Sequence, residues 1–231
     1  MHKISKKGID IIMNKKGFTL AEILIALGII GVLSAILLPA FFRSKPNEEM
    51  LILKKSYYLM SRAVSEIIND DDFYPDDPEG DNYSGFSNTS SVTYHGQNDI
   101  EGNEKFCKLV GAKINSVQTP FCTDYYTLSD GIPAVGFHFT TPEGAGWILP
   151  INNFNRGSAN STQSIYVDVN GNKGANCFAG SNGCTKPDRF EFKIDRWGKL
   201  SVDDELTRRY LSSTNITKTY KQFAKELGSV E

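Results

Sequence analysis

The chain has 231 residues, of which 40% are hydrophobic and 23% charged, with 20 glycines and 9 prolines. This composition excludes a collagen-like, a mainly disordered and a polytopic membrane protein. The formal net charge of −2 gives no reason to expect a nucleic-acid-binding protein. Charge is unevenly distributed, however. Residues 1–17 contain five lysines and one aspartate, so the remainder of the chain is acidic.

One segment is long and apolar enough to cross a bilayer: residues 23–42 are twenty consecutive residues without a charged side chain. At about 1.5 Å per residue, a helix of that length spans the roughly 30 Å hydrocarbon core. Lysines precede this segment and are scarce just after it, which predicts a cytoplasmic N-terminus and an extracytoplasmic remainder. A secretory signal peptide is the alternative, but cleavage after Ala35 or Ala40 would place a leucine where a small residue is needed.

An acidic residue, Glu22, lies at the start of this apolar run. A charged side chain at membrane depth costs about 2.5–3.5 kcal/mol on insertion scales, so such residues are usually paired or functional. Apolar residues already precede it, namely Phe18, Leu20 and Ala21. Glu22 is therefore more than the boundary of the apolar helix.

A family resemblance rests on residues 15–22, Lys15-Lys16-Gly17-Phe18-Thr19-Leu20-Ala21-Glu22, and on Pro39 in the apolar run. This pattern resembles the class III signal of type IV pilins and type II secretion pseudopilins. In that family a prepilin peptidase cleaves after the glycine and methylates the new N-terminus. The resemblance implies cleavage between Gly17 and Phe18, N-methylation of Phe18, and assembly roles for Glu22 and Pro39.

The same resemblance implies a structural subunit of a type II secretion pseudopilus or a type IV pilus, in the inner membrane, serving protein secretion or a surface filament. It implies as partners prepilin peptidase, other pilin or pseudopilin subunits, an inner-membrane assembly platform with its ATPase, and membrane lipid. In lipid, the Phe18 amine released by cleavage is a natural partner for the Glu22 carboxylate of a neighbouring subunit. The alternative is a single-pass, membrane-anchored extracytoplasmic binding protein that does not polymerise.

An amphipathic helix is predicted over residues 47–68, because apolar residues there recur at spacings of three and four. These are Met50, Leu53, Tyr57, Met60, Val64 and Ile67, opposite a polar face with Lys54, Lys55, Ser56 and Arg62. The stripe is too short for a coiled coil, so we expect it to pack on the protein's own sheet. The family resemblance implies that this helix continues the membrane helix.

Alternating apolar residues predict four half-buried strands, at residues 135–140, 146–149, 165–169 and 189–195. Turn-rich loops between them favour an antiparallel sheet with one apolar face, covered by the helix. The fold class is therefore α+β and pilin-like. The predicted organisation is a cytoplasmic leader at 1–17, a transmembrane and polymerisation helix at 18–42, its amphipathic continuation at 43–69, and an extracytoplasmic domain at 70–231.

Three further segments carry weaker patterns. Prolines and like charges argue against a regular element in the acidic segment 70–81. Residues 83–103 are rich in Ser, Asn, Gly and Thr and predict a loop with at most one short strand. The polar tail at 203–227 predicts one or two surface helices.

Four cysteines, Cys107, Cys122, Cys177 and Cys184, all lie in the predicted extracytoplasmic domain, where disulfides persist. Sequence proximity favours the pairs Cys107–Cys122 and Cys177–Cys184, although four cysteines allow three pairings. Their spacings are wider than those of a four-cysteine zinc site.

Candidate calcium ligands are Asp168, Asn170, Asn172 and Asp188, because some pseudopilins have calcium in a loop of the C-terminal sheet region. The run at 168–174 is similar to D-x-N-x-N calcium loops but lacks the glycine and the closing glutamate of an EF-hand. A turn with Asx hydrogen bonds is the alternative, and no other cofactor is expected. The chain has no G-x-S-x-G, P-loop or dinucleotide-binding motif, so the sequence predicts that it is not an enzyme.

Overall fold

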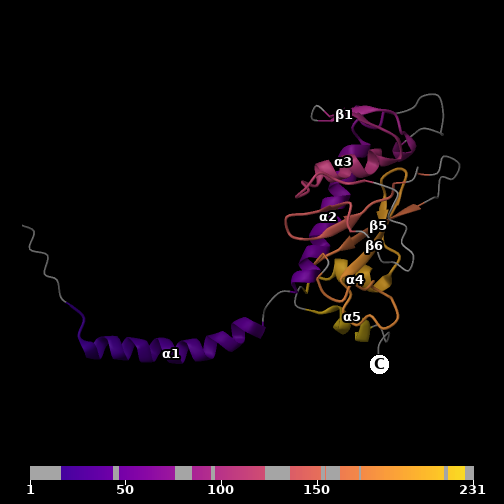
Figure 1. Cartoon of the computed structure of the whole chain (residues 1–231). Helices are drawn as coiled ribbons and strands as arrows, with labels where there is room; N and C mark the ends of the chain where they lie inside the picture. Colours follow the sequence, from indigo (N-terminus) through magenta and orange to yellow (C-terminus); the bar gives the residue numbers. More distant parts are fainter. Residues whose placement is uncertain are drawn as a thin grey trace, which may run out of the picture. The chain divides into compact units, whose positions relative to one another are not determined.

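The structure is a computed structural model (Figure 1), which describes residues 17–43, 47–75, 85–94, 97–122, 136–151, 154, 162–171, 173–215 and 218–226. The chain divides into two compact units, Met1–Lys45 and Pro46–Glu231. The predicted leader at 1–17 lies outside the described residues, apart from Gly17.

The described residues of the first unit contain helix α1 (Leu20–Arg43), which includes Pro39. Its large apolar side chains are exposed from Leu20 to Leu38. The stretch Leu20–Pro39 has the length and apolar composition needed to cross a membrane. Exposing this much apolar surface to water is unfavourable. A helix that is apolar on all sides therefore needs lipid or other helices around it.

The second unit begins with helix α2 (Glu48–Ile68), which starts at its own N-cap. The Asn47 backbone is extended there, and the Asn47 Oδ1 atom accepts a hydrogen bond from the Met50 amide at 3.3 Å. The single uninterrupted helix implied by the family resemblance is therefore broken at Asn47, and residues 44–46 lie outside the described part of the chain. A physical reason is the Asn47 side chain, which satisfies the Met50 amide and so stabilises the first turn of a separate helix.

The predicted apolar stripe of α2 is confirmed as its buried face. Met50, Leu53, Met60, Val64 and Ile67 are buried, and Tyr57 packs against the core. Ser56 was expected on the polar face, but it is buried, with 4% exposure. It lies three residues after Leu53 and four before Met60, so helical geometry places it within the apolar stripe.

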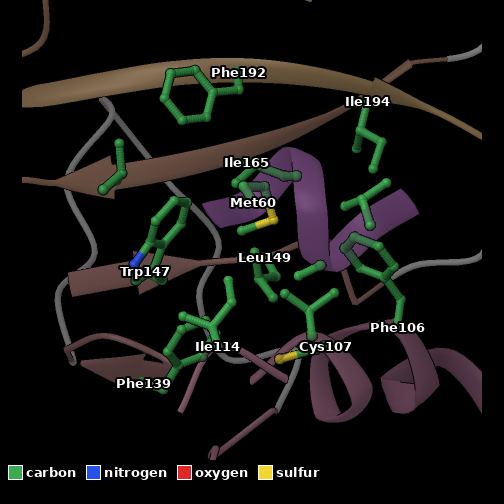
Figure 2. Packing of buried hydrophobic residues seen from close by; sticks show 14 of the residues in the cluster. Met60, Phe106, Cys107, Ile114, Phe139, Trp147, Leu149, Ile165, Phe192 and Ile194 are labelled. Carbon is green, nitrogen blue, oxygen red and sulfur yellow. The ribbon is translucent and has the colours of Figure 1, made fainter. Parts of the chain in front are cut away.

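The core sheet is a five-stranded antiparallel meander in the order β3-β4-β5-β6-β7. Its strands are β3 (Phe139–Thr140), β4 (Gly146–Ile148), β5 (Thr162–Asp168), β6 (Arg189–Asp195) and β7 (Leu200–Ser201). Inward-facing residues pair across the strands, with Ile165 opposite Phe192 and Trp147 opposite Val167. Figure 2 shows Met60 of α2 lying near Ile165, within one core. The predicted α+β class is thus confirmed, with β7 as an additional strand and β3 shorter than predicted.

The remaining elements include a hairpin that the sequence did not predict. Strands β1 (Val92–Tyr94) and β2 (Gln97–Ile100) pair antiparallel in the region expected to hold at most one strand. A single 3-10 turn (Gly85–Ser87) precedes this hairpin and another (Gly102–Glu104) follows it. Helix α3 (Lys105–Lys113) comes directly after the second turn. Residues 70–75 of the acidic segment form no helix or strand, and residues 76–81 lie outside the described residues.

The predicted helices of the tail are present as α4 (Glu205–Ser212) and α5 (Tyr220–Glu226). They are not simply surface helices, because Tyr210, Tyr220 and Phe223 are buried. The rings of Tyr220 and Phe223 meet the Tyr210 ring at centroid distances of 5.9 and 5.4 Å. The tail therefore extends the hydrophobic core.

A lysine is buried among apolar residues at the start of α3. Lys105 is 1% exposed, and its Nζ atom has no hydrogen-bond partner among the described residues. The Nζ atom lies 4.3 Å from the centroid of the Tyr74 ring, within cation–π distance. Burial disfavours the charged form and lowers the Lys105 pKa to about 8.

This burial predicts that Lys105→Met stabilises the protein near neutral pH. The folded state binds the lysine proton more weakly than the unfolded state, whose lysine pKa is near 10.4, so stability due to Lys105 rises with pH between about 8 and 10.4. The free energy of unfolding of the variant should exceed that of the wild type by up to about 3 kcal/mol at pH 7, and the gap should narrow by pH 9.5. Urea unfolding of both proteins, followed by the fluorescence of Trp147 and Trp197, measures this difference in the free energy of unfolding. A gap independent of pH would contradict a buried charged lysine.

Candidate processing and assembly site

The predicted cleavage point lies just outside a helix. Gly17 and Phe18 are exposed and precede the first helical residue, Leu20. The Phe18 side chain is 83% exposed. A β-carbon built on Gly17 would meet no atom within 4 Å. A peptidase can therefore reach the bond between Gly17 and Phe18 without first unwinding α1.

Glu22 is held by the N-terminus of its own helix. Its Oε2 atom accepts hydrogen bonds from the Thr19 amide at 2.7 Å and from the Thr19 hydroxyl at 2.9 Å. The Thr19 hydroxyl in turn accepts a hydrogen bond from the Glu22 amide at 3.2 Å. This reciprocal arrangement is a capping box, in which two amides that lack helical partners are satisfied by side chains.

The capping box explains how an acid is accommodated at the end of an apolar helix. The N-terminal end of a helix carries partial positive charge, which favours a carboxylate there. Thr19 was missed as a functional residue in the sequence analysis, although a threonine three residues before a glutamate is the signature of a capping box. Pro39 lies inside α1, where its missing amide removes one helical hydrogen bond.

Comparison with known proteins identifies the N-terminal segment. A family model described as the prokaryotic N-terminal methylation motif matches residues 12–38, which include the cleavage point, the capping box and most of α1. The N-terminal segment is therefore of the pilin type. No curated protein and no solved structure matches the chain. The match covers the N-terminal segment alone.

The four cysteines of the chain form two disulfides, Cys107–Cys122 and Cys177–Cys184. This is the pairing that sequence proximity favours. Their environments differ: Cys107 and Cys122 are buried in the core, with exposures of 0% and 3%, whereas Cys177 and Cys184 are half-buried in a surface loop.

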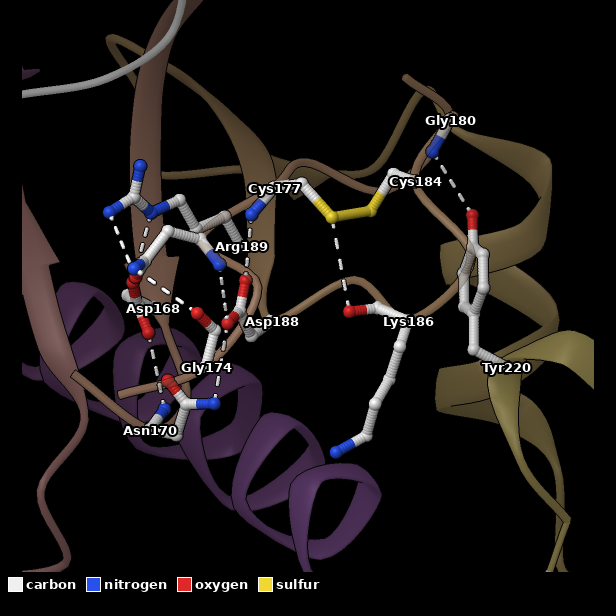
Figure 3. The surroundings of a disulfide bond; sticks show 11 residues. Asp168, Asn170, Gly174, Cys177, Gly180, Cys184, Lys186, Asp188, Arg189 and Tyr220 are labelled. Carbon is white, nitrogen blue, oxygen red and sulfur yellow. Dashed lines mark hydrogen bonds and ion pairs between the residues drawn. A yellow bond between two sulfur atoms is a disulfide. The ribbon is translucent and has the colours of Figure 1, made fainter. Parts of the chain in front are cut away.

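Three of the four predicted calcium ligands lie together beside the second disulfide (Figure 3). The Asp168 Oδ2 atom accepts a hydrogen bond from the Arg189 Nε atom at 2.9 Å in a buried ion pair. The Asp188 carboxylate accepts from the amides of Cys177 and Asn176 at 2.9 and 2.8 Å, and from the Asn170 side-chain amide at 3.3 Å.

These contacts occupy the carboxylates with protein donors. The Asp168 pKa is raised to about 6. Burial is the main cause, the Arg189 hydrogen bond opposes it, and the nearby Asp188 carboxylate contributes to the rise. In the described part of the chain, no group of three or more histidine, cysteine or acidic residues could hold a metal ion. Asn172, the fourth predicted ligand, lies outside the described residues. Calcium binding stays a prediction, which thermal unfolding with and without calcium tests.

Proposed function

We propose that this pilin-type protein is a structural subunit that prepilin peptidase processes and that then assembles into a type II secretion pseudopilus or a type IV pilus. The observation that carries the proposal is the conjunction of three features at the start of α1. The predicted scissile bond is exposed, Thr19 and Glu22 cap the helix, and the large apolar side chains of α1 are exposed among the described residues of its unit. Polymerisation through α1 would bury this apolar surface among neighbouring subunits and lipid.

The proposed topology places the leader in the cytoplasm, α1 across the inner membrane and the domain from Pro46 onward on the extracytoplasmic side. The lysine-rich leader supports this orientation through the positive-inside bias. The two disulfides support it as well, because disulfides persist outside the cytoplasm. The proposed partners are prepilin peptidase, other subunits of the same kind, an assembly platform with its ATPase, and membrane lipid.

Cleavage changes the electrostatics next to Glu22. It removes the lysine-rich leader and creates a positively charged amine on Phe18, one residue before Thr19. The Glu22 carboxylate already accepts two hydrogen bonds from Thr19, and a carboxylate has further acceptor capacity. The Phe18 amine of a neighbouring subunit can therefore add to the existing contacts without displacing them. In lipid, such a pair offsets the cost of two isolated charges and sets the register between subunits.

The experiment that tests processing is intact mass and N-terminal sequencing of the full chain co-expressed with a prepilin peptidase. We expect a mature chain that starts at Phe18 and carries one added methyl group. Gly17→Val should block cleavage, because it places a branched side chain at the scissile bond, and the matched substitution Gly28→Ala inside α1 should leave cleavage intact. An uncut wild-type chain with an active peptidase present would contradict the proposal.

The alternative function is that of a single-pass anchored binding protein that does not polymerise. It shares the membrane helix but needs neither cleavage nor the Glu22 carboxylate. Recovery of the mature chain in sheared filament fractions supports the subunit, and recovery in the membrane fraction alone, in cells with a working assembly machine, supports the anchor. A catalytic role is not part of the proposal, since the pilin-type motif indicates a structural subunit.

A further inference from the structure

We infer that the Cys177–Cys184 disulfide is a redox-sensitive latch that holds the C-terminal helix α5 on the domain. The two disulfides of the domain differ in burial. Cys107 and Cys122 are buried in the core, while Cys177 and Cys184 are half-buried. A groove of about 550 Å³ runs beside the second disulfide and is lined by Cys184, Gly180 and Tyr220. A small thiol in solution can therefore reach Cys184.

The loop closed by this disulfide has one arm that the sheet holds independently. The Cys177 amide donates to the Asp188 carboxylate at 2.9 Å, and the Ala179 amide donates to the Arg189 carbonyl at 2.9 Å. These bonds fix residues 177–179 along the start of β6 whether or not the disulfide is present. The other arm, residues 180–184, has two described backbone hydrogen bonds within the loop: the Ser181 amide donates to the Phe178 carbonyl at 3.2 Å, and the Cys184 amide donates to the Ser181 carbonyl at 3.1 Å. Neither bond joins this arm directly to β6. The disulfide is the covalent bond that joins this arm to Cys177.

The second arm contacts α5. The Gly180 amide donates a hydrogen bond to the Tyr220 hydroxyl oxygen at 3.1 Å (Figure 3). Gly180 has a φ of +80°, and a β-carbon there would lie 3.2 Å from the Asp204 carboxylate. Glycine readily adopts other backbone conformations, so reduction of the disulfide frees Gly180 to turn its amide away from Tyr220.

Helix α5 depends on such contacts, since a helix of seven residues is not stable by itself in water. Its attachments are the rings of Tyr220 and Phe223 on Tyr210 and the hydrogen bond from Gly180. The segment before α5 also reaches the start of α2, where the Asn47 side-chain amide donates to the Lys218 carbonyl at 3.3 Å. Opening the latch therefore loosens the C-terminal segment where it meets the N-cap of α2.

The chemical step is thiol–disulfide exchange with a dithiol reductant. A thiolate of the reductant attacks the Sγ atom of Cys184, the bond between the two protein sulfurs breaks, and Cys177 leaves as a thiolate. The second thiol of the reductant then displaces the Cys184 thiolate and closes the disulfide of the reductant. The protein gains two electrons and two protons, and the dithiol is oxidised.

The test uses the full chain in detergent micelles with graded dithiothreitol, alkylation of free thiols, and hydrogen exchange read by mass spectrometry. We expect Cys177 and Cys184 to be alkylated at least about tenfold faster than Cys107 and Cys122, whose reduction requires local unfolding. We expect amide exchange in residues 220–226 to rise roughly fivefold on reduction, which corresponds to the loss of about one hydrogen bond. Alkylation of all four cysteines at one rate, or unchanged exchange in α5 after reduction, would overturn the inference.

Two variants separate the latch from general loosening. The pair Cys177→Ser and Cys184→Ser should show the raised exchange in α5 without any reductant. Tyr220→Phe removes the hydroxyl that accepts from Gly180 and keeps the ring, so it should raise exchange in the oxidised protein and abolish the further rise on reduction. A full rise on reduction in Tyr220→Phe would show that Tyr220 does not transmit the redox state.

Discussion

Glu22→Gln is expected to be cleaved normally by prepilin peptidase and to reach filaments at less than about one-tenth of the wild-type level. Glutamine keeps the acceptor oxygen that caps α1 at Thr19, because the capping box accepts either side chain. It removes the negative charge that pairs with the Phe18 amine. A loss of about 1.4 kcal/mol per contact already lowers an association constant tenfold, and a charge pair in lipid exceeds that. Quantitative immunoblotting of sheared filaments against the membrane fraction measures the effect.

Two further variants locate the cause. Glu48→Gln changes an acid in the first turn of α2 and should assemble like the wild type, since that residue is exposed at the start of a different helix. Glu22→Ala removes both the charge and the cap, so it should assemble no better than Glu22→Gln. Wild-type incorporation of Glu22→Gln would contradict charge pairing as the basis of assembly, and would leave capping of α1 as the role of Glu22.

Arg189→Leu is expected to lower the free energy of unfolding by about 3–5 kcal/mol at pH 7. The substitution leaves the Asp168 carboxylate buried without its cation and close to the Asp188 carboxylate. Because burial already raises the Asp168 pKa to about 6, the carboxyl group of the variant takes up a proton as the pH falls, and the loss should be smaller at pH 5 than at pH 7. Urea unfolding at the two pH values, followed by tryptophan fluorescence, gives both numbers.

The matched control for this prediction is Arg209→Leu on α4. Arg209 pairs with Glu205 at 3.3 Å, but both side chains are more than half exposed, so its removal should cost less than about 1 kcal/mol. The double variant Asp168→Leu with Arg189→Leu should recover part of the lost stability, since replacing both partners of a buried pair leaves no unpaired charge. Equal losses for Arg189→Leu at pH 5 and pH 7 would show that the ionised Asp168 is not the cause.

Much of the candidate site could be predicted from the chain alone because its signals are local. Gly17, Phe18 and Glu22 are recognised by their order along ten residues, and α1 by an uninterrupted apolar composition. The buried stripe of α2 follows from a period that needs no knowledge of its partner. The signal for Thr19 is equally local, since a threonine three residues before a glutamate is the signature of a capping box.

Other features depend on which distant segments meet, and no local pattern encodes that. Lys105 is a charged residue, but packing buries it. Asp168 and Asp188 are predicted oxygen ligands, and the fold also brings Arg189 and four amide donors to them. The polar tail contributes Tyr210 and Phe223 to the core because a short helix gains stability from tertiary contacts more than from its own sequence.

The sequence by itself determined that this protein has a pilin-type N-terminal motif, a membrane-length helix with an acid near its start, and an antiparallel sheet covered by an amphipathic helix. Each of these is specified by residues close together in the chain. Only the tertiary structure decided that Asp168 pairs with Arg189 and that Gly180 meets Tyr220. Those contacts join segments far apart in the chain, and their formation depends on how the whole core packs.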